Sequence, residues 1–154
     1  MAAADEPASI HNNALEALEL LVGEWRVEIS NAEFLADGTT LTGHMSVTWL
    51  DGHALLVLRS TIANGPPASI QVVGRNEDAD DFTLLYADDR GVSRVYRMSF
   101  GDGQWTLSRT DPGFYQRFTG RLLDHGDRVE ASWSASHDEG NTWHHDFDLI
   151  YLRT

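Results

Sequence analysis

Alternation of apolar and polar residues in steps of two is the feature that most constrains this chain. Between residues 131 and 151 every second residue is apolar or aromatic on both sides of a polar turn, as in Trp133, Phe147 and Leu149. Such alternation is typical of β-strands that bury one face. Turn signals such as Asp102-Gly103 recur at short intervals upstream. The sequence therefore predicts ten strands, over residues 24–31, 40–50, 53–63, 68–75, 81–87, 92–100, 104–110, 115–123, 130–136 and 143–151.

A ten-stranded antiparallel meander with one apolar face is expected to close on itself, because closure removes the exposed edges. We therefore predict an all-β, up-and-down β-barrel, with an open, strongly bent sheet as the alternative. Asn12 or Asn13 can cap a short helix that Gly23 stops, and this helix is expected to close one end. At 154 residues the chain is expected to hold a flexible arm over residues 1–12 and a single barrel domain over residues 13–154.

Turn lengths predict how two hairpins pair. A two-residue turn at Asp102-Gly103 places Trp105 opposite Phe100, and places Arg109 opposite Tyr96. In the last hairpin, the aromatic residues of both strands share a face only with an odd loop, such as residues 138–142, or with a β-bulge. Of these two we predict the odd loop.

Composition excludes several classes of function. The formal net charge of −13 disfavours nucleic acid and anionic membranes as partners. The chain has no Cys and no Lys, which excludes disulfides, thiolate chemistry and a lysine Schiff base. No metal-ligand spacing or common nucleotide motif is present, so no metal is expected. The first residues lack a basic and an apolar region, and a cytoplasmic protein is the default expectation.

Polar side chains in the inward phase are the candidate site residues. These are Arg109, Tyr96, Arg94, His145, Tyr151 and Tyr86. Arg109 beside Tyr96 could anchor an acidic head group, since a buried arginine needs an anion or several acceptors. The alternative is an ion pair at the end of the barrel. His145 is a candidate base or haem ligand, the alternative being a hydrogen-bonded interior histidine.

Two short motifs carry a resemblance to known families. Residues 136–143, Ser-His-Asp-Glu-Gly-Asn-Thr-Trp, resemble an Asp-box, a hairpin motif in which Asp138 and Thr142 tie the turn. Residues 20–25, Leu-Leu-Val-Gly-Glu-Trp, resemble the opening of calycin and lipocalin-like barrels. In those barrels a Gly-x-Trp packs at the closed end, often against a late arginine. With its C-terminal segment, the chain is similar to a lipocalin-like family of bacterial proteins of unknown function.

Two further barrel families bear on the ligand. The haem-binding nitrobindins are similar in length and opening, but Arg26-Val27-Glu28-Ile29 stands here where they continue with further glycines and Tyr-Pro. Fatty-acid-binding proteins resemble the predicted plan and hold carboxylates with Arg and Tyr, which offers an analogy for Arg109 and Tyr96.

We therefore expect a barrel that binds a small, largely apolar ligand in its interior. The alternatives are an isomerase, cyclase or hydrolase that uses His145 as base, a haem protein, and a dimerisation module with a filled core. Residues 53–63 suggest a homodimer, since they are apolar on both faces.

Overall fold

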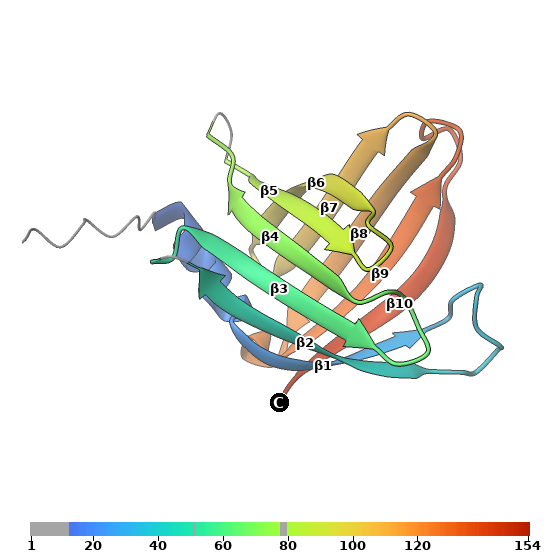
Figure 1. Cartoon of the computed structure of the whole chain (residues 1–154), viewed down its shortest axis with the longest axis horizontal. Coiled ribbons are helices and arrows are strands. Elements are labelled where there is room, and N and C mark those ends of the chain that lie inside the picture. The colour runs from blue at the N-terminus through green and yellow to red at the C-terminus, as the bar shows by residue number, and fades with distance from the viewer. Residues whose placement is uncertain (1–12, 51, 78–79) are drawn as a thin grey trace, which may run out of the picture.

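The chain forms a closed, ten-stranded antiparallel β-barrel (Figure 1), as a computed structural model describes it for residues 13–50, 52–77 and 80–154. Neighbouring strands follow the order of the sequence, and β1 pairs with β10 to close the ring. The predicted fold class is confirmed, and the open bent sheet is wrong. The predicted arm over residues 1–12 lies outside the described residues. The elements are η1 (Asn13–Leu21), β1 (Gly23–Ser30), β2 (Leu41–Leu50), β3 (Leu55–Ile62), β4 (Ser69–Arg75), β5 (Phe82–Asp88), β6 (Ser93–Gly101), β7 (Gln104–Asp111), β8 (Phe114–Leu123), η2 (Asp124–Gly126), β9 (Arg128–Ser136) and β10 (His144–Arg153).

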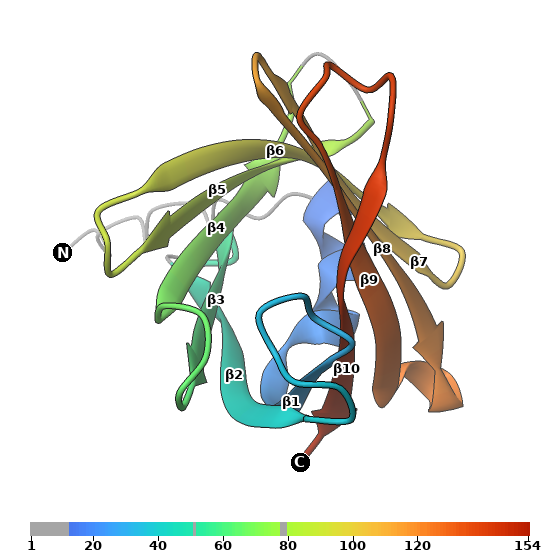
Figure 2. The same cartoon turned by 90° about the vertical axis from the view of Figure 1, so that its right-hand side faces the viewer.

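The 3-10 helix η1 closes one end of the barrel (Figure 2). Its Leu18 and Leu21 are buried, and the Leu21 carbonyl accepts a hydrogen bond of 2.8 Å from the Trp25 indole. The Arg153 guanidinium lies 4.2 Å from the centre of the Trp25 ring and donates to the Val22 carbonyl at 2.7 Å. The packing expected of a Gly-x-Trp opening is therefore confirmed. Gly23 leaves room for it, because a Cβ there would lie 2.8 Å from Arg153 Nη1.

The first predicted register is confirmed where the strands pair. Phe100 lies opposite Trp105, and the ladder between β6 and β7 continues to Arg97. This ladder ends before Tyr96 and Arg109, and on the other edge of β7 Arg109 pairs with Gln116 of β8. Strand β7 therefore lies between β6, which carries Tyr96, and β8, which carries Gln116.

A β-bulge sets the register of the last hairpin. His144 pairs with Ala135, so an even number of residues, 136–143, separates them. The register then shifts between His145 and Phe147, and Phe147 pairs with Trp133. The predicted odd loop is wrong, and the bulge that was its alternative brings the two aromatic phases together.

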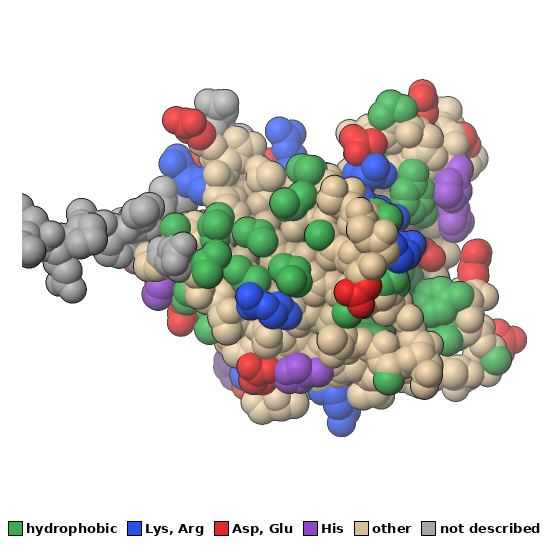
Figure 3. Space-filling model, viewed as in Figure 1, with side chains coloured by type: hydrophobic (Ala, Val, Ile, Leu, Met, Phe, Trp, Pro, Cys, Tyr) green, Lys and Arg blue, Asp and Glu red, His purple; other side chains and the backbone are tan. Residues whose placement is uncertain are grey.

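An apolar patch covers part of the outer surface of β3 to β6 (Figure 3). Val57, Val72, Leu85 and Val95 lie directly opposite one another across these four strands. Val95 and Leu85 are about half exposed, so the second apolar face expected of residues 53–63 continues onto neighbouring strands. The homodimer that this face suggested stays a prediction.

Candidate functional site

The barrel encloses a cavity of about 520 Å³ at the end opposite η1. The connections β1–β2, β3–β4, β5–β6, β7–β8 and β9–β10 all lie at this open end, as Figure 2 shows. Cavities of this size fall in the range that small-molecule ligands occupy. The interior is therefore not filled by side chains, in contrast to the filled core of the alternative dimerisation module.

The cavity has a mostly apolar wall and a more polar wall, and further polar residues such as Gln71 of β4 and Asp146 of β10 also line it. Strands β9, β10 and β1 provide the apolar wall, which consists of Trp133, Phe147, Leu149, Val27 and Ile29. Strands β5, β6 and β8 provide the polar wall, which consists of Tyr86, Arg94, Tyr96 and Gln116. A largely apolar site with a few convergent polar groups is typical of ligand pockets.

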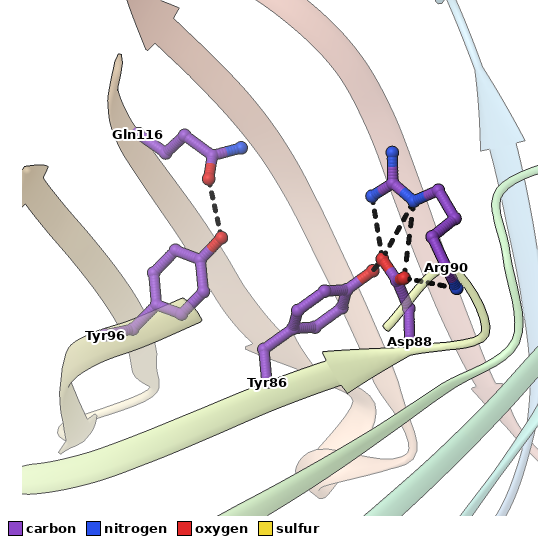
Figure 4. Close-up of polar contacts among 5 residues, drawn as sticks. All are labelled: Tyr86, Asp88, Arg90, Tyr96 and Gln116. Carbon is purple, nitrogen blue, oxygen red and sulfur yellow. Dashed lines mark hydrogen bonds and ion pairs between the residues drawn. The ribbon is translucent and has the colours of Figure 1, made fainter. Parts of the chain in front are cut away.

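Tyr96 and Gln116 form a hydrogen bond across the polar wall (Figure 4). The Tyr96 hydroxyl donates to Gln116 Oε1 at 2.6 Å, and the two residues are 3% and 7% exposed. Burial raises the pKa of the Tyr96 hydroxyl, and the nearby Arg94 and Arg109 oppose that rise. Tyr96 therefore stays neutral in the physiological range.

Arg94 lines the cavity and has no counter-ion among the described residues. It lies directly opposite Tyr86 in the β5–β6 ladder, one step nearer the open end than Tyr96. Its guanidinium lies 5.8 Å from the centre of the Tyr86 ring and 5.3 Å from that of Phe114. It forms no ion pair with any carboxylate in the described part of the chain, including Asp146, which also lines the cavity. Two aromatic faces thus stabilise a half-buried charge that could accept an anion.

Tyr86, Asp88 and Arg90 form a second polar group at the open end (Figure 4). Asp88 accepts hydrogen bonds from the Tyr86 hydroxyl and from Arg90 Nη2, both at 2.7 Å. The Arg90 hydrogen bonds hold the pKa of Asp88 well below its usual range, and the Tyr86 bond adds to this. Burial, together with this carboxylate, raises the pKa of Tyr86 to about 12. Arg90 lines the cavity but is already paired, unlike Arg94.

Arg109, the leading candidate from the sequence, already pairs with groups of the barrel wall. Its Nη2 lies 2.9 Å from an Asp111 carboxylate oxygen, and its Nη1 donates to the Phe114 carbonyl at 2.7 Å. Arg109 is not among the residues that line the cavity, although Tyr96 and Gln116 beside it are. The ion pair that was the alternative for this residue is therefore the one that the structure shows. The arginine of β6 that lines the cavity together with Tyr96 is Arg94.

His145 lies on the outside of the barrel, and the prediction that it faces inward is wrong. Its ring nitrogen lies 2.8 Å from an Asp148 carboxylate oxygen, and almost half of its side chain is exposed. Asn31 donates to the other oxygen of Asp148 at 2.7 Å. The bulge between His145 and Phe147 is the physical cause, because one extra residue reverses the phase that parity assigns.

Tyr151 lies in the cavity wall, in the inward phase that the sequence predicted. It is buried, and burial raises the pKa of its hydroxyl well above the usual range. Its ring contacts Trp105 at a centroid distance of 5.9 Å on the closed-end side of the cavity. Its hydroxyl forms no hydrogen bond with other residues of the described ranges, so it remains available to a ligand.

The Asp-box forms the tight turn between β9 and β10. Asp138 accepts hydrogen bonds from the Thr142 amide at 2.8 Å and the Thr142 hydroxyl at 2.6 Å. These bonds, with one from the Ser136 hydroxyl, lower the pKa of Asp138 to about 2. The structural role expected of Asp138 and Thr142 agrees with this geometry.

Several residues at the cavity were not predicted as site residues. Gln116 is neither charged nor aromatic and so was not a candidate, although its position on β8 is in the inward phase. Phe34 lies in the β1–β2 connection and Phe114 is the first residue of β8, both at the open end, where alternation gives no guide. The turn residues Asp88 and Arg90 could have been recognised only as a charge pair two residues apart.

Histidine ligation of a metal or haem finds no support among the described residues of the cavity. No group of three or more His, Asp or Glu side chains in the described ranges could hold a metal ion. None of the residues lining the cavity is a histidine. His145 therefore has no access to a haem bound in this cavity.

Known structures share the barrel plan. No family model matches the chain, and no curated protein is similar to it in sequence. The chain is similar to Rv2717c from M. tuberculosis, with a TM-score of 0.65 and 15% identity over 93% of this chain and 98% of that one. It is also similar to the S-type phycobiliprotein lyase CPES from Guillardia theta, with a TM-score of 0.57 and 12% identity over 88% and 89% of the two chains. At these identities the similarity extends to the fold alone. In the described ranges, no helix is both long and apolar enough to span a membrane.

Proposed function

We propose that this protein binds a small, largely apolar ligand with an acidic head group inside the barrel. The observation that carries the proposal is Arg94, a cavity-lining cation that no carboxylate of the described residues pairs with. An arginine that is partly removed from water gains most from an anion that its planar guanidinium can hold with two hydrogen bonds. The apolar wall opposite accounts for the rest of the ligand.

The two ends of the cavity fix the expected orientation. Arg94 and Tyr86 lie toward the open end, whereas Tyr151 and Leu107 line the cavity nearer to η1. We expect the head group to lie beside Arg94, where solvent can reach it. The apolar part extends toward Tyr151 and leaves water as it does so, which supplies the favourable free energy.

The proposal is tested with two probes that differ only in the head group. Isothermal titration calorimetry of pentadecanoic acid and pentadecanol measures how much of the affinity depends on the charge. Charge-assisted hydrogen bonds contribute about 1.5–3 kcal/mol, so Arg94→Gln is expected to weaken acid binding roughly 10- to 100-fold. The same substitution is expected to leave pentadecanol binding nearly unchanged.

Arg121→Gln is the matched control, because it removes the same charge from the outer surface. Arg121 is 70% exposed and pairs with Glu130 at 3.7 Å. We expect it to leave both affinities unchanged. Failure of pentadecanoic acid to bind, or equal loss of acid binding in both variants, would contradict a head-group site at Arg94.

The other functions considered from the sequence lack such support. An isomerase, cyclase or hydrolase that uses His145, and a haem protein, both require that histidine inside the barrel, where the structure does not put it. The similarity to a phycobiliprotein lyase concerns the barrel plan. The cytoplasmic location and the homodimer stay predictions.

A further inference from the structure

Gln116 presents a buried amide to the cavity from β8. Its side chain lines the cavity and only 7% of the residue is exposed. Its Oε1 accepts from the Tyr96 hydroxyl, whereas its Nε2 forms no hydrogen bond with any other described residue. In Figure 4 that nitrogen points away from Tyr96, toward the side where Tyr86 and Asp88 stand. This nitrogen is not among the fully buried atoms that lack a partner, so it is accessible from the cavity and can donate to an acceptor that a ligand brings.

The bond to Tyr96 uses only the oxygen of the Gln116 amide. The Tyr96 hydroxyl donates to Gln116 Oε1 at 2.6 Å, and the amide nitrogen carries two further hydrogens that can be donated. Both hydrogens of the Gln116 amide nitrogen consequently remain available to the cavity.

We propose that the ligand carries, besides the acidic group at Arg94, a hydrogen-bond acceptor that binds Gln116 Nε2. This inference rests on the function proposed above and narrows its ligand class. The class is an amphiphile in which a carboxylate is followed, a few atoms along the chain, by an uncharged acceptor such as an amide carbonyl. A plain alkyl chain would remove water from the Gln116 amide without forming a hydrogen bond to it. A carbonyl oxygen also removes that water, but it accepts a hydrogen bond from Gln116 Nε2 in exchange.

The test compares N-lauroylglycine with pentadecanoic acid by isothermal titration calorimetry. The two acids have backbones of equal length, and only the first has an amide carbonyl near its carboxylate. We expect the wild-type protein to prefer N-lauroylglycine by roughly 3- to 10-fold, the effect of one neutral hydrogen bond. Gln116→Met is expected to remove that preference while pentadecanoic acid still binds, which also shows that the variant folds.

A second pair of variants separates Gln116 from its partner. Gln116→Met frees the Tyr96 hydroxyl, so we compare Tyr96→Phe with the Tyr96→Phe, Gln116→Met double variant, in which that hydroxyl is absent from both. The preference is expected in the single variant and not in the double one. Tyr151→Phe removes another unpaired polar group of the same cavity, and it is expected to retain the preference.

The outcomes separate this inference from the function on which it rests. If both acids bind equally well and Arg94→Gln weakens both, the head-group site stands and the role of Gln116 is refuted. If Tyr151→Phe rather than Gln116→Met removes the preference, the second acceptor binds at Tyr151 and the inference is likewise refuted. If neither acid binds, the proposed function itself fails.

Discussion

Arg153 is expected to hold the closed end of the barrel together, and its removal should cost measurable stability. The guanidinium donates to the carbonyl oxygens of Leu20 and Val22, at the junction of η1 and β1, and stacks 4.2 Å from the centre of the Trp25 ring. Its Nε lies 2.8 Å from Asp127. One side chain from β10 therefore joins η1, β1 and the start of β9.

The magnitude follows from these contacts. Two hydrogen bonds from a charged group contribute about 1.5 kcal/mol each, and the cation–π contact adds about 1 kcal/mol. The exposed pair with Asp127 adds little. The Arg153 side chain is 26% exposed, so water can replace some of the lost bonds in a variant. We therefore expect Arg153→Met to lower the free energy of unfolding by about 3 kcal/mol, and Tm by roughly 6–12 °C.

Urea denaturation followed by circular dichroism measures this loss. Arg121→Met is the control, since it removes an exposed arginine whose ion pair should contribute less than about 1 kcal/mol. Arg153→Lys keeps the charge but cannot reach both carbonyls in the geometry of a guanidinium, so we expect it to recover less than half of the loss. The reasoning is refuted if Arg153→Met and Arg121→Met have the same effect, or if lysine restores full stability.

Two further predictions concern residues away from the cavity. His145→Gln should leave the affinity for pentadecanoic acid within about twofold of wild type, because His145 lies on the outer surface beside Asp148; a large loss in calorimetry would place the histidine inside. Asp138 has its pKa lowered from 3.8 to about 2, so its contribution to stability should be complete above about pH 4 and lost as the pH falls toward 2. The stability of Asp138→Asn, measured by acid unfolding, should lack the part of the pH dependence that Asp138 contributes. In the wild-type protein, an Asp138 carboxyl NMR resonance that titrates near its ordinary pKa would show that the turn is not formed in solution.

Alternation predicted the fold and part of the site because it reports on which face of a strand is buried. It placed Tyr96, Arg94 and Tyr151 inward, and each of them lines the cavity. Parity fails where a strand is irregular. The bulge after His145 shifts the phase of β10, and nothing in the local residues distinguishes a bulge from an odd loop.

The alternation along a strand indicates the face from which a side chain starts, but it does not indicate where the end of a long side chain lies. Arg109 starts on the same wall as Tyr96, but its guanidinium reaches the Asp111 carboxylate and the Phe114 carbonyl instead of the cavity. The importance of Gln116 depends on a neighbour two strands away, at Tyr96. Such partnerships depend on the twist and tilt of the closed sheet, which a linear pattern does not contain.

The pairing of β1 with β10 has a consequence for how the chain is made. Trp25 is synthesised early, yet its partner Arg153 lies at the far end of the described sequence. On the ribosome, one edge of β1 therefore waits without hydrogen bonds until β10 has left the exit tunnel. During that interval the nascent sheet has two open edges, each able to pair with a strand of another chain. Ring closure therefore has to wait for β10, and a polypeptide interrupted before β10 would keep an edge of β1 that can pair with other chains.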